Sequence, residues 1–392
     1  PNGQFNWLGS GDVASDTFTY EITDGNEAFS TATVTVQVSG VNDGPVIESA
    51  PPAARRGAYS DGIQPITVTA SDLDATALDI TAALSGPDGD VALPVDPPAG
   101  EPGLHVATVA CEGGGAASPL ECEWVLSGAA RLPAGAYRLT VVVTDGESAV
   151  SQVTEGALVV DVEAARLTFD SENTTTVEVV APGGTAQGFT LWLEAEEQLP
   201  EPNGDPALPG DINRAAVSVV LEPVGPGSTV GPIACASTGT VPSYDYTAQL
   251  LVACDFPASL AVPVNVYTVR ATVEGAYYEA QNADVLVVYD PSLGAVNGGG
   301  WFYWPGTANP AMGYPGDKTN FAINTKYNKS GKNLQGQILV IRHLADDSRY
   351  EMESNVLTGL SLGKVTPLSM GWATVTGRST YQEPGWSEPQ GN

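Results

Sequence analysis

Residues 19–38 read TYEITDGNEAFSTATVTVQV and carry the clearest structural signal of the chain. Apolar and polar residues alternate on both sides of a turn formed by Asp24 and Gly25. The apolar positions of the two arms are Tyr20, Ile22, Val34, Val36 and Val38. Alternation at a period of two around an Asp-Gly turn predicts a β-hairpin.

The same hairpin pattern returns twice along the chain. Residues 137–162 carry it around the Asp145-Gly146 turn, and a weaker copy surrounds Glu274-Gly275. Each copy predicts the last two strands of a β-sandwich, and each is followed by a change in sequence texture. The chain is therefore predicted to be all-β, with tandem Ig-like or cadherin-like β-sandwich domains and a C-terminal aromatic-rich β domain.

The length of 392 residues suits three or four such domains. The predicted segments are 1–46 (the C-terminal half of a repeat), 47–164 (a sandwich), 165–291 (a second sandwich) and 292–392 (the aromatic-rich domain). Both ends are expected to interrupt a domain, which makes the chain a fragment of a longer precursor. No stretch approaches the roughly 18 apolar residues of a membrane-spanning helix, so no membrane insertion is predicted.

Two segments resemble known bacterial families. Residues 18–46, FTYEITDGNEAFSTATVTVQVSGVNDGPV, resemble the end of a cadherin-like or VCBS-type repeat, a tandem module of large adhesins. Residues 296–306, VNGGGWFYWPG, and 380–392, TYQEPGWSEPQGN, resemble the post-COAP domain found near the C-terminus of secreted multidomain proteins. These resemblances imply a secreted or cell-surface protein and transfer no enzymatic activity.

The charge is acidic and unevenly distributed. Residues 1–291 contain seven Arg, no Lys and 39 acidic residues, whereas residues 292–392 contain eight basic and seven acidic residues. Such a field repels nucleic acid and attracts divalent cations, although an acidic surface that only confers solubility explains it equally well. Without Lys, no Lys–Asn isopeptide crosslink can form within the first 291 residues.

The four Cys fall into two local pairs, Cys111 with Cys122 and Cys235 with Cys254. An even number of Cys in an extracellular context favours disulfides, each worth about 3 kcal/mol in the chain-entropy model. Zinc is the competing interpretation, but it requires close C-x-x-C spacing or clustered His, and the sequence has neither.

Calcium binding is the sharpest chemical hypothesis, because hard cations take oxygen ligands from Asp, Asn and carbonyl groups. The cadherin resemblance implies three ligand elements: a linker Asn-Asp, an early Asp-x-Asp in the next domain, and an Asp near that domain's last hairpin. The matching residues are Asn42, Asp43, Asp72, Asp74 and Asp145. Alternatively, these residues only satisfy turn geometry, and the linker has Gly40 and Val41 where the family has a leading Asp.

Catalysis is not predicted. The two His residues, His105 and His343, lie in different predicted domains, and the sequence has no nucleophile elbow, H-E-x-x-H motif or phosphate-binding glycine loop.

Aromatic residues concentrate near the C-terminus, which holds 11 of the 29. In a strand, Trp301 and Tyr303 point one way while Phe302 and Trp304 point the other. One pair is expected to fill a core, leaving the other for a glycan, a subunit or a neighbouring domain. Trp301, Tyr303 and Trp304 are the candidate contacts, with Tyr314, Trp372 and Trp386 as further aromatic residues.

The leading functional hypothesis is a structural or adhesive extracellular protein of a prokaryotic cell surface. Its partners would be further copies or neighbouring domains of the same precursor. Because half-domains leave sheet edges unpaired, strands from neighbouring copies could complete them and build a filament or lattice. The alternative is a carbohydrate-binding accessory module of a larger secreted enzyme.

Overall fold

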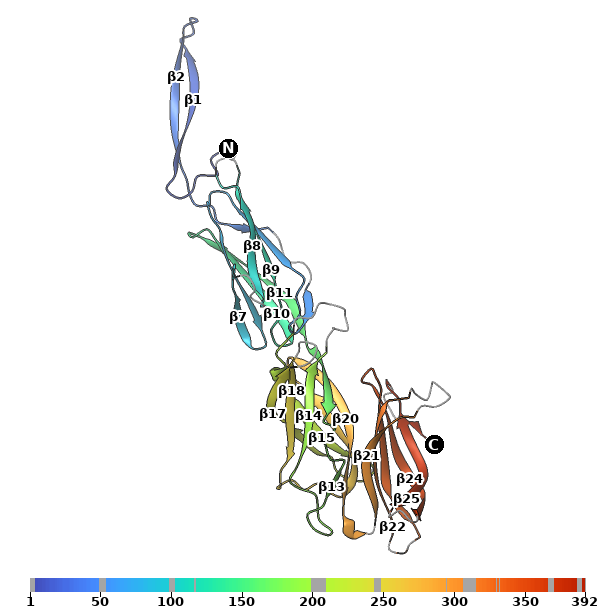
Figure 1. Ribbon diagram of the computed structural model, residues 1–392. Helices are drawn as coiled ribbons and strands as arrows, with labels where there is room; N and C mark the ends of the chain where they lie inside the picture. The colour runs from blue at the N-terminus through green and yellow to red at the C-terminus, as the bar shows by residue number, and fades with distance from the viewer. Residues whose placement is uncertain are drawn as a thin grey trace. The chain divides into compact units, whose positions relative to one another are not determined.

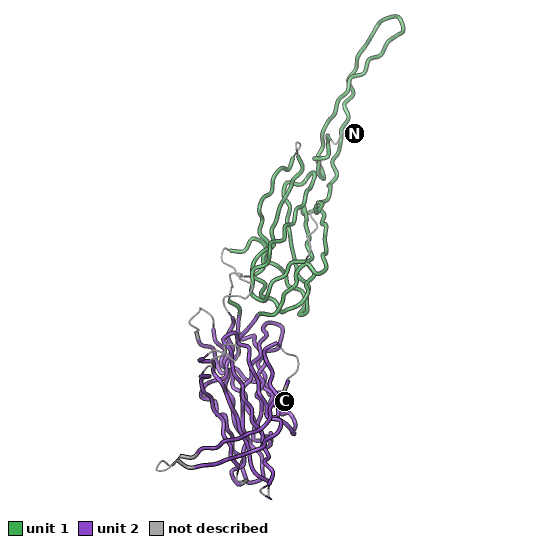
Figure 2. The backbone as a smooth tube through the Cα atoms, turned by 90° about the vertical axis from the view of Figure 1, so that its right-hand side faces the viewer, with its two compact units in different colours: residues 1–163, 202–210 green, residues 164–201, 211–392 purple. Residues whose placement is uncertain are grey.

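The computed structural model describes residues 4–48, 54–98, 103–115, 118–198, 209–242, 248–293, 295–305, 315–328, 330, 332–365, 370–385 and 390–391. Its regular structure is almost entirely β-strand, with two short 3-10 turns at Ile212–Arg214 and Pro291–Leu293. Within these ranges no helix is long and apolar enough to cross a membrane. The chain divides into two compact units, residues 1–163 with 202–210 and residues 164–201 with 211–392 (Figure 2).

The first unit begins with the predicted hairpin, formed by β1 (Val13–Thr23) and β2 (Phe29–Ser39). Asp24 accepts a hydrogen bond from the Asn26 N–H at 2.8 Å, and Gly25 supplies the positive φ that the turn needs. The two strands pair with each other and with no other strand among the described residues (Figure 1). The hairpin is therefore a sheet of two strands.

The first sandwich follows the hairpin and consists of two sheets. Their strand orders are β3-β5-β9-β8 and β4-β11-β10-β6-β7, which are the A-B-E-D and A′-G-F-C-C′ orders of an Ig-like sandwich. The strands are β3 (Val46–Ile47), β4 (Arg55–Ala58), β5 (Ile66–Asp72), β6 (Asp79–Gly86), β7 (Gly89–Leu93), β8 (His105–Glu112), β9 (Leu120–Ser127), β10 (Gly135–Thr144) and β11 (Ala149–Asp161).

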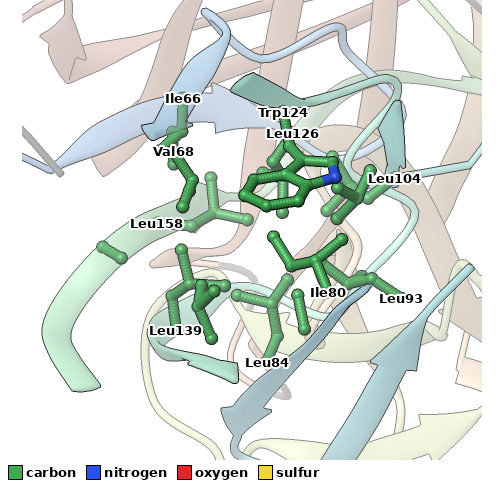
Figure 3. Packing of buried hydrophobic residues seen from close by; sticks show 14 of the residues in the cluster. Ile66, Val68, Ile80, Leu84, Leu93, Leu104, Trp124, Leu126, Leu139 and Leu158 are labelled. Carbon is green, nitrogen blue, oxygen red and sulfur yellow. The ribbon is translucent and has the colours of Figure 1, made fainter. Parts of the chain in front are cut away.

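The core of this sandwich comes from the inward positions of both sheets. In β5 and β9, buried residues alternate with more exposed ones along the strand, as a half-buried strand requires. Figure 3 shows the indole of Trp124 within the resulting cluster, near Val68, Ile80 and Leu104. Each such buried side chain contributes about 1.5–3 kcal/mol relative to exposure.

The second sandwich repeats the same strand order. Its strands form one sheet, β16-β15-β19-β20-β12-β14-β18-β17, whose two ends meet where β15 and β16 contact β18. In Ig terms the order is C′-C-F-G followed by A-B-E-D. The strands are β12 (Glu163–Phe169), β13 (Thr176–Glu178), β14 (Phe189–Glu197), β15 (Val217–Pro223), β16 (Val230–Ala234), β17 (Ala236–Pro242), β18 (Ala248–Phe256), β19 (Asn265–Val273) and β20 (Tyr278–Tyr289).

Two local features recur in both sandwiches. A short strand runs parallel to the last strand in each, β4 beside β11 and β13 beside β20. A Tyr near the start of each F strand also donates its hydroxyl to a carbonyl four residues upstream. These bonds join Tyr137 to Pro133 at 2.6 Å and Tyr267 to Pro263 at 2.9 Å. This tyrosine corner is a hallmark of Ig-like sandwiches and supports the predicted fold class.

Both predicted disulfides are formed. Cys111 in β8 faces Cys122 in β9, and Cys235, between β16 and β17, joins Cys254 in β18. Both bonds connect the D and E regions within one sheet. They differ in this respect from the disulfide of antibody domains, which joins strands B and F across the two sheets.

The chain ends in a six-stranded antiparallel meander, β21 to β26 in sequence order. One face of this terminal sheet packs on the outer face of β19 and β20, so those two strands are covered on both sides. The shared apolar cluster contains Val224, Val266, Ala283, Val285, Val287, Ala322, Leu339 and Ile341. The strands are β21 (Val296–Tyr303), β22 (Lys318–Tyr327), β23 (Leu334–His343), β24 (Arg349–Val365), β25 (Met370–Gln382) and β26 (Gln390–Gly391).

Polar contacts reinforce this contact between sheets. Buried Asp284 accepts a hydrogen bond from the Asn320 amide, and Glu351 accepts one from the Thr268 hydroxyl at 3.0 Å. Arg270 pairs with Glu351 across the same contact at 3.4 Å. The second sandwich and the terminal sheet thus share one core and one polar network.

Candidate functional site

The predicted calcium ligands come together in the first unit. Asn42 and Asp43 lie in the linker after β2, Asp72 and Asp74 lie at the end of β5 and in the turn that follows, and Asp145 lies in the β10–β11 turn. We call these five residues the acidic junction. The Ig-like strand order places the end of strand B and the F–G turn at the same end of the sandwich, where the linker enters.

Asn42 ties the linker to the β10–β11 turn. Its amide donates to the carboxylate of Asp145 at 2.9 Å, and that carboxylate also accepts from the N–H groups of Glu147 and Ser148 at 2.7 and 2.6 Å. Although burial alone would raise the pKa of Asp145, these hydrogen bonds hold it at about 2. Asp145 is therefore ionised, and its two oxygens are already engaged in turn and linker contacts.

Asp72 and Asp74 behave differently. One oxygen of Asp72 accepts from the N–H groups of Asp74 and Ala75 at 3.0 and 2.8 Å, which is ordinary turn geometry. The other oxygen is buried without a hydrogen-bond partner, in a side chain that is only 2% exposed. Asp74 likewise has one oxygen on the Asp43 N–H at 3.1 Å and one buried oxygen without a partner.

The two carboxylates are also close enough to affect each other. Burial raises the pKa of Asp74, and the neighbouring charges of Asp72 and Asp43 raise it further. A buried carboxylate oxygen without a donor is costly, and two near each other add like-charge repulsion. A divalent cation would remove both costs.

The donor set fits Ca²⁺, which prefers carboxylate, amide and backbone oxygens. The oxygens are near one another but not converged, because no group of three or more His, Cys, Asp or Glu side chains in the described ranges forms a ready metal cage. Of the five predicted ligands, Asp72 and Asp74 have the unused oxygens that would hold the ion, whose chemistry there is charge neutralisation; Asn42 and Asp43 lie beside them in the linker, and the Asp145 carboxylate is already engaged.

The N-terminal turn also lies beside the acidic junction, which no motif in the sequence indicates. A side chain at Gly9 would lie 3.3 Å from Asp74, and the Gly9 N–H donates to Asp12 at 3.2 Å. A side chain at Gly40 would collide with the carbonyls of Leu8 and Gly9. Gly40 thus lets the turn pack against the linker.

The aromatic residues of β21 alternate between the two faces of the terminal sheet. Trp301 and Tyr303 lie on the face of the terminal sheet that packs on β19 and β20. They lie beyond the covered part of that face and are 47% and 64% exposed. Their rings meet edge to face at 5.3 Å, and the Lys318 ammonium lies 5.9 Å from the Trp301 ring. One of the two aromatic pairs of β21 was expected to fill a core. Trp301 and Tyr303 do not, because both side chains are exposed at the edge of the sheet.

Phe302 and Trp304 lie on the opposite face of the terminal sheet. The strand register adds Phe321, Val340, Met352 and Tyr381 to this side. We call these six residues the terminal face; it is hollowed by a cavity of about 480 Å³ whose lining includes Trp304, Val340, Met352 and Tyr381. Phe302 is also partly exposed, so neither aromatic pair of β21 fills a closed core. Trp372 is exposed, whereas Tyr314 and Trp386 fall outside the described residues.

Arg342 packs against aromatic rings at the terminal face. Its guanidinium lies 5.0 Å from the Trp304 ring and 5.5 Å from the Tyr350 ring, and it pairs with Asp317 beneath them. Such stacking of a guanidinium on aromatic rings fixes their orientation. Apolar and polar residues alternate in residues 338–342 and 350–352, which is a sequence signal for this face. The signal identifies the face only once the pairing of the strands is known.

A second uncovered apolar surface lies on the hairpin. The register pairs Phe18 with Val34 and Tyr20 with Ala32, so most apolar residues of the two strands share one side, which also carries Asp16; Val13 and Phe29 lie on the other side. We call Phe18, Tyr20, Ile22, Val34, Val36 and Val38 the hairpin face. Phe18 and Ile22 are 55% and 58% exposed.

The histidines offer no paired site. His105 lies in the first unit, with its ring nitrogen 3.1 Å from the Gly103 carbonyl, and His343 lies in the second unit. Burial, together with Lys318 and Arg349, lowers the pKa of His343 to about 4. It is therefore neutral at physiological pH.

Comparisons with known proteins add little. No protein-family model matches the chain, and no curated protein matches it. Among solved structures, a titin substructure is 10% identical with a TM-score of 0.28, covering 63% of this chain and 100% of its own. An I-band fragment of titin is 9% identical with a TM-score of 0.30, covering 72% of this chain and 94% of its own. Such low values carry no functional argument, and the Ig-like assignment rests on the strand order and the tyrosine corners. The cadherin-like and post-COAP resemblances stay expectations.

Proposed function

We propose that the chain is a structural or adhesive part of an extracellular protein of a prokaryotic cell surface, with a calcium ion fixing the hairpin to the first sandwich. The observation that carries this proposal is the pair of buried, partnerless carboxylate oxygens on Asp72 and Asp74 beside the linker. Two Ig-like sandwiches in tandem and two disulfides support the structural and extracellular parts of the proposal.

Calcium would act mechanically at this junction. The linker reaches the sandwich through the Asn42 amide, which donates to Asp145 and Ser148, and through the Asp43 N–H, which donates to Asp74. A cation shared by linker and sandwich oxygens would add stronger contacts to these hydrogen bonds. The linker would then be stiff only while calcium is bound.

Calcium is therefore expected to stabilise the first unit. At a hundredfold excess over the Kd, binding to the folded state adds about 2.7 kcal/mol to the free energy of unfolding. For a unit of this size that corresponds to a rise in Tm of about 5–10 °C. Scanning calorimetry with calcium and with a chelator measures it, and Asp74→Asn should abolish the shift.

Asp90→Asn is the matched control, since Asp90 is an exposed acidic residue of the same unit in β7. It removes the same charge and should retain the full calcium shift. Equal shifts in both variants would mean that calcium acts on the general acidic surface and not at the junction.

Self-association is the second part of the proposal. Among the described residues no strand pairs with either edge of the hairpin or covers its mostly apolar face, and an isolated two-stranded hairpin is only marginally stable in water. Contact with another copy would cover that face. A filament or lattice at the cell surface would follow from repeating the contact.

A glycan-binding role is the second candidate function, favoured by the exposed Trp301–Tyr303 pair. Aromatic stacking contributes about 0.5–1.5 kcal/mol beyond area, so Trp301→Ala should weaken binding of the chain to an immobilised polysaccharide about tenfold. Trp192→Ala, which removes a similarly exposed Trp from β14, should leave binding unchanged. Equal retention of both variants, or no retention of the parent protein on any polysaccharide, would eliminate this role.

A further inference from the structure

The exposed Trp301–Tyr303 pair lies beside a row of basic side chains. The register of β21 and β22 pairs Tyr303 with Lys318. The β22–β23 register extends by one residue to bring Lys318 beside His343, and His343 pairs with Arg349 of β24. Directly opposed residues of neighbouring strands point to the same side of a sheet. The aromatic pair and the three basic residues therefore share one face of the terminal sheet.

The charge of this row comes from Lys318 and Arg349. Burial and the charges of these two residues lower the pKa of His343 to about 4, against an opposing effect of Asp347. His343 is therefore neutral at physiological pH. The Asp347 carboxylate is already paired with Arg166 at 3.0 Å. The row thus keeps a positive potential in a chain that is acidic as a whole.

Lys318 is the basic residue next to the aromatic pair, and its ammonium lies 5.9 Å from the Trp301 ring. Among the described residues, no carboxylate forms an ion pair with this ammonium, and it donates no hydrogen bond. Buried Asp284, whose charged form Lys318 favours, accepts its hydrogen bonds from the Asn320 amide and the Val285 N–H instead. An uncommitted cation is thus held beside an exposed aromatic ring.

This arrangement suits a sugar that carries a carboxylate. A sugar ring presents apolar C–H groups that stack on an aromatic side chain, and its hydroxyls can hydrogen-bond to the phenol of Tyr303. A Lys ammonium is a compact point charge that pairs with a single carboxylate. The two kinds of contact lie side by side on one sheet edge, where β21 pairs only with β22 among the described residues.

The distribution of charge favours a polymer with widely spaced carboxylates. The net charge of −31 repels densely charged polymers such as nucleic acid. Residues 292–392, which carry the site, are close to neutral, with eight basic and seven acidic residues. Arg349 lies two strands from Lys318, about 10 Å away at about 4.8 Å per strand, so its charge still acts near the site.

We propose that Trp301, Tyr303 and Lys318 bind a polysaccharide that contains uronic acids, with a sugar ring on the aromatic pair and its carboxylate on the Lys318 ammonium. This inference rests on the glycan-binding role given above as the second candidate function, and it names the class of glycan. The aromatic pair contributes binding to neutral and acidic glycans alike, whereas Lys318 contributes the preference for the acidic ones.

Two forms of one polymer test this preference. Polygalacturonate and its fully methyl-esterified form present the same sugar ring with and without the charge. By biolayer interferometry, the whole chain should bind the charged form about tenfold more tightly, as expected for one charge-assisted hydrogen bond. Lys318→Gln should abolish this preference and leave binding to the ester unchanged. Lys318→Arg retains the charge and should retain the preference.

Lys326→Gln is the matched control. Lys326 is a half-exposed Lys on the same strand and the same face, about 26 Å along at about 3.3 Å per residue. The variant should bind both polymers as the parent does. Trp301→Ala should weaken binding to both, and polyglutamate, which has carboxylates without sugar rings, should not be bound. Melting curves verify that the variants are folded.

Four results would overturn the proposal. The first two are equal affinity of the parent for the two forms and an unaltered preference in Lys318→Gln. The third is binding of polyglutamate as tight as that of polygalacturonate, which would indicate an acidic peptide as the ligand. The fourth is no binding of either form. Retention of the parent on any other polysaccharide would then leave the glycan-binding role standing, whereas no retention on any polysaccharide would remove that role as well.

Discussion

Replacing Trp124 with Ala is expected to lower the free energy of unfolding of the first unit by about 3–5 kcal/mol. Trp124 is 2% exposed and lies in β9 at the centre of the first sandwich core, in contact with residues of both sheets (Figure 3). Removing the indole loses its burial energy and leaves a cavity that the rigid β-sheets cannot close. Urea denaturation followed by circular dichroism measures the change.

Trp192→Ala is the control for this substitution. Trp192 is a strand Trp of the second sandwich whose side chain is largely exposed, so its loss creates no cavity. We expect a change within about 0.5 kcal/mol, as for other surface positions. A similar cost for both substitutions would contradict the placement of Trp124 in the core.

Leu339→Asp is expected to have the second large effect. Leu339 in β23 is completely buried between the terminal sheet and the β19–β20 face of the second sandwich. An aspartate there either ionises without a partner or is forced to stay protonated, and either state costs several kcal/mol. Because the second sandwich and the terminal sheet share this core, the whole second unit should lose stability.

Calorimetry distinguishes this outcome from independent unfolding of the terminal sheet. Leu339→Asp should lower the Tm of the second unit by more than about 10 °C and leave the transition of the first unit unchanged. Gln335→Asp, at an exposed position of the same strand, should change neither transition. An unaltered transition of the second sandwich in Leu339→Asp would show that the terminal sheet is not part of its core.

The local β structure could be predicted because it depends on local patterns. Alternation around the turns at Asp24-Gly25, Asp145-Gly146 and Glu274-Gly275 identified three hairpins, and each is present as β1–β2, β10–β11 and β19–β20. The Cys pairs were predictable because the two members of each pair are close in sequence, so a single turn of the chain brings them side by side. These features require no knowledge of distant contacts.

The packing of the terminal sheet on the second sandwich could not be predicted in this way. Its one local sign is in β20, where residues 283–288 read ADVLVV and are all buried. In an antiparallel strand with one solvent-exposed face, buried and exposed residues alternate. An unbroken run of buried residues therefore indicates that both faces of the strand are covered. That pattern indicates a partner layer but does not identify which segment of the chain supplies it.

The acidic junction was predictable only as a set of residues. The linker and turn motifs indicated Asn42, Asp72 and Asp145, but Asp145 turns out to be fully engaged by the turn while Asp72 and Asp74 have unused oxygens. The orientation of a carboxylate side chain decides which of its oxygens lacks a hydrogen-bond partner. The spacing of residues in the sequence does not give that orientation. The contribution of the N-terminal turn at Gly9 also depends on the fold.

Titration calorimetry of calcium into the whole chain tests whether the acidic junction binds calcium. We predict one saturable site that is lost in Asp74→Asn and retained in Asp90→Asn, because Asp74, unlike Asp90, borders the linker and has a buried oxygen without a donor. An absence of saturable binding in the parent protein, or undiminished binding in Asp74→Asn, would contradict a calcium-fixed junction.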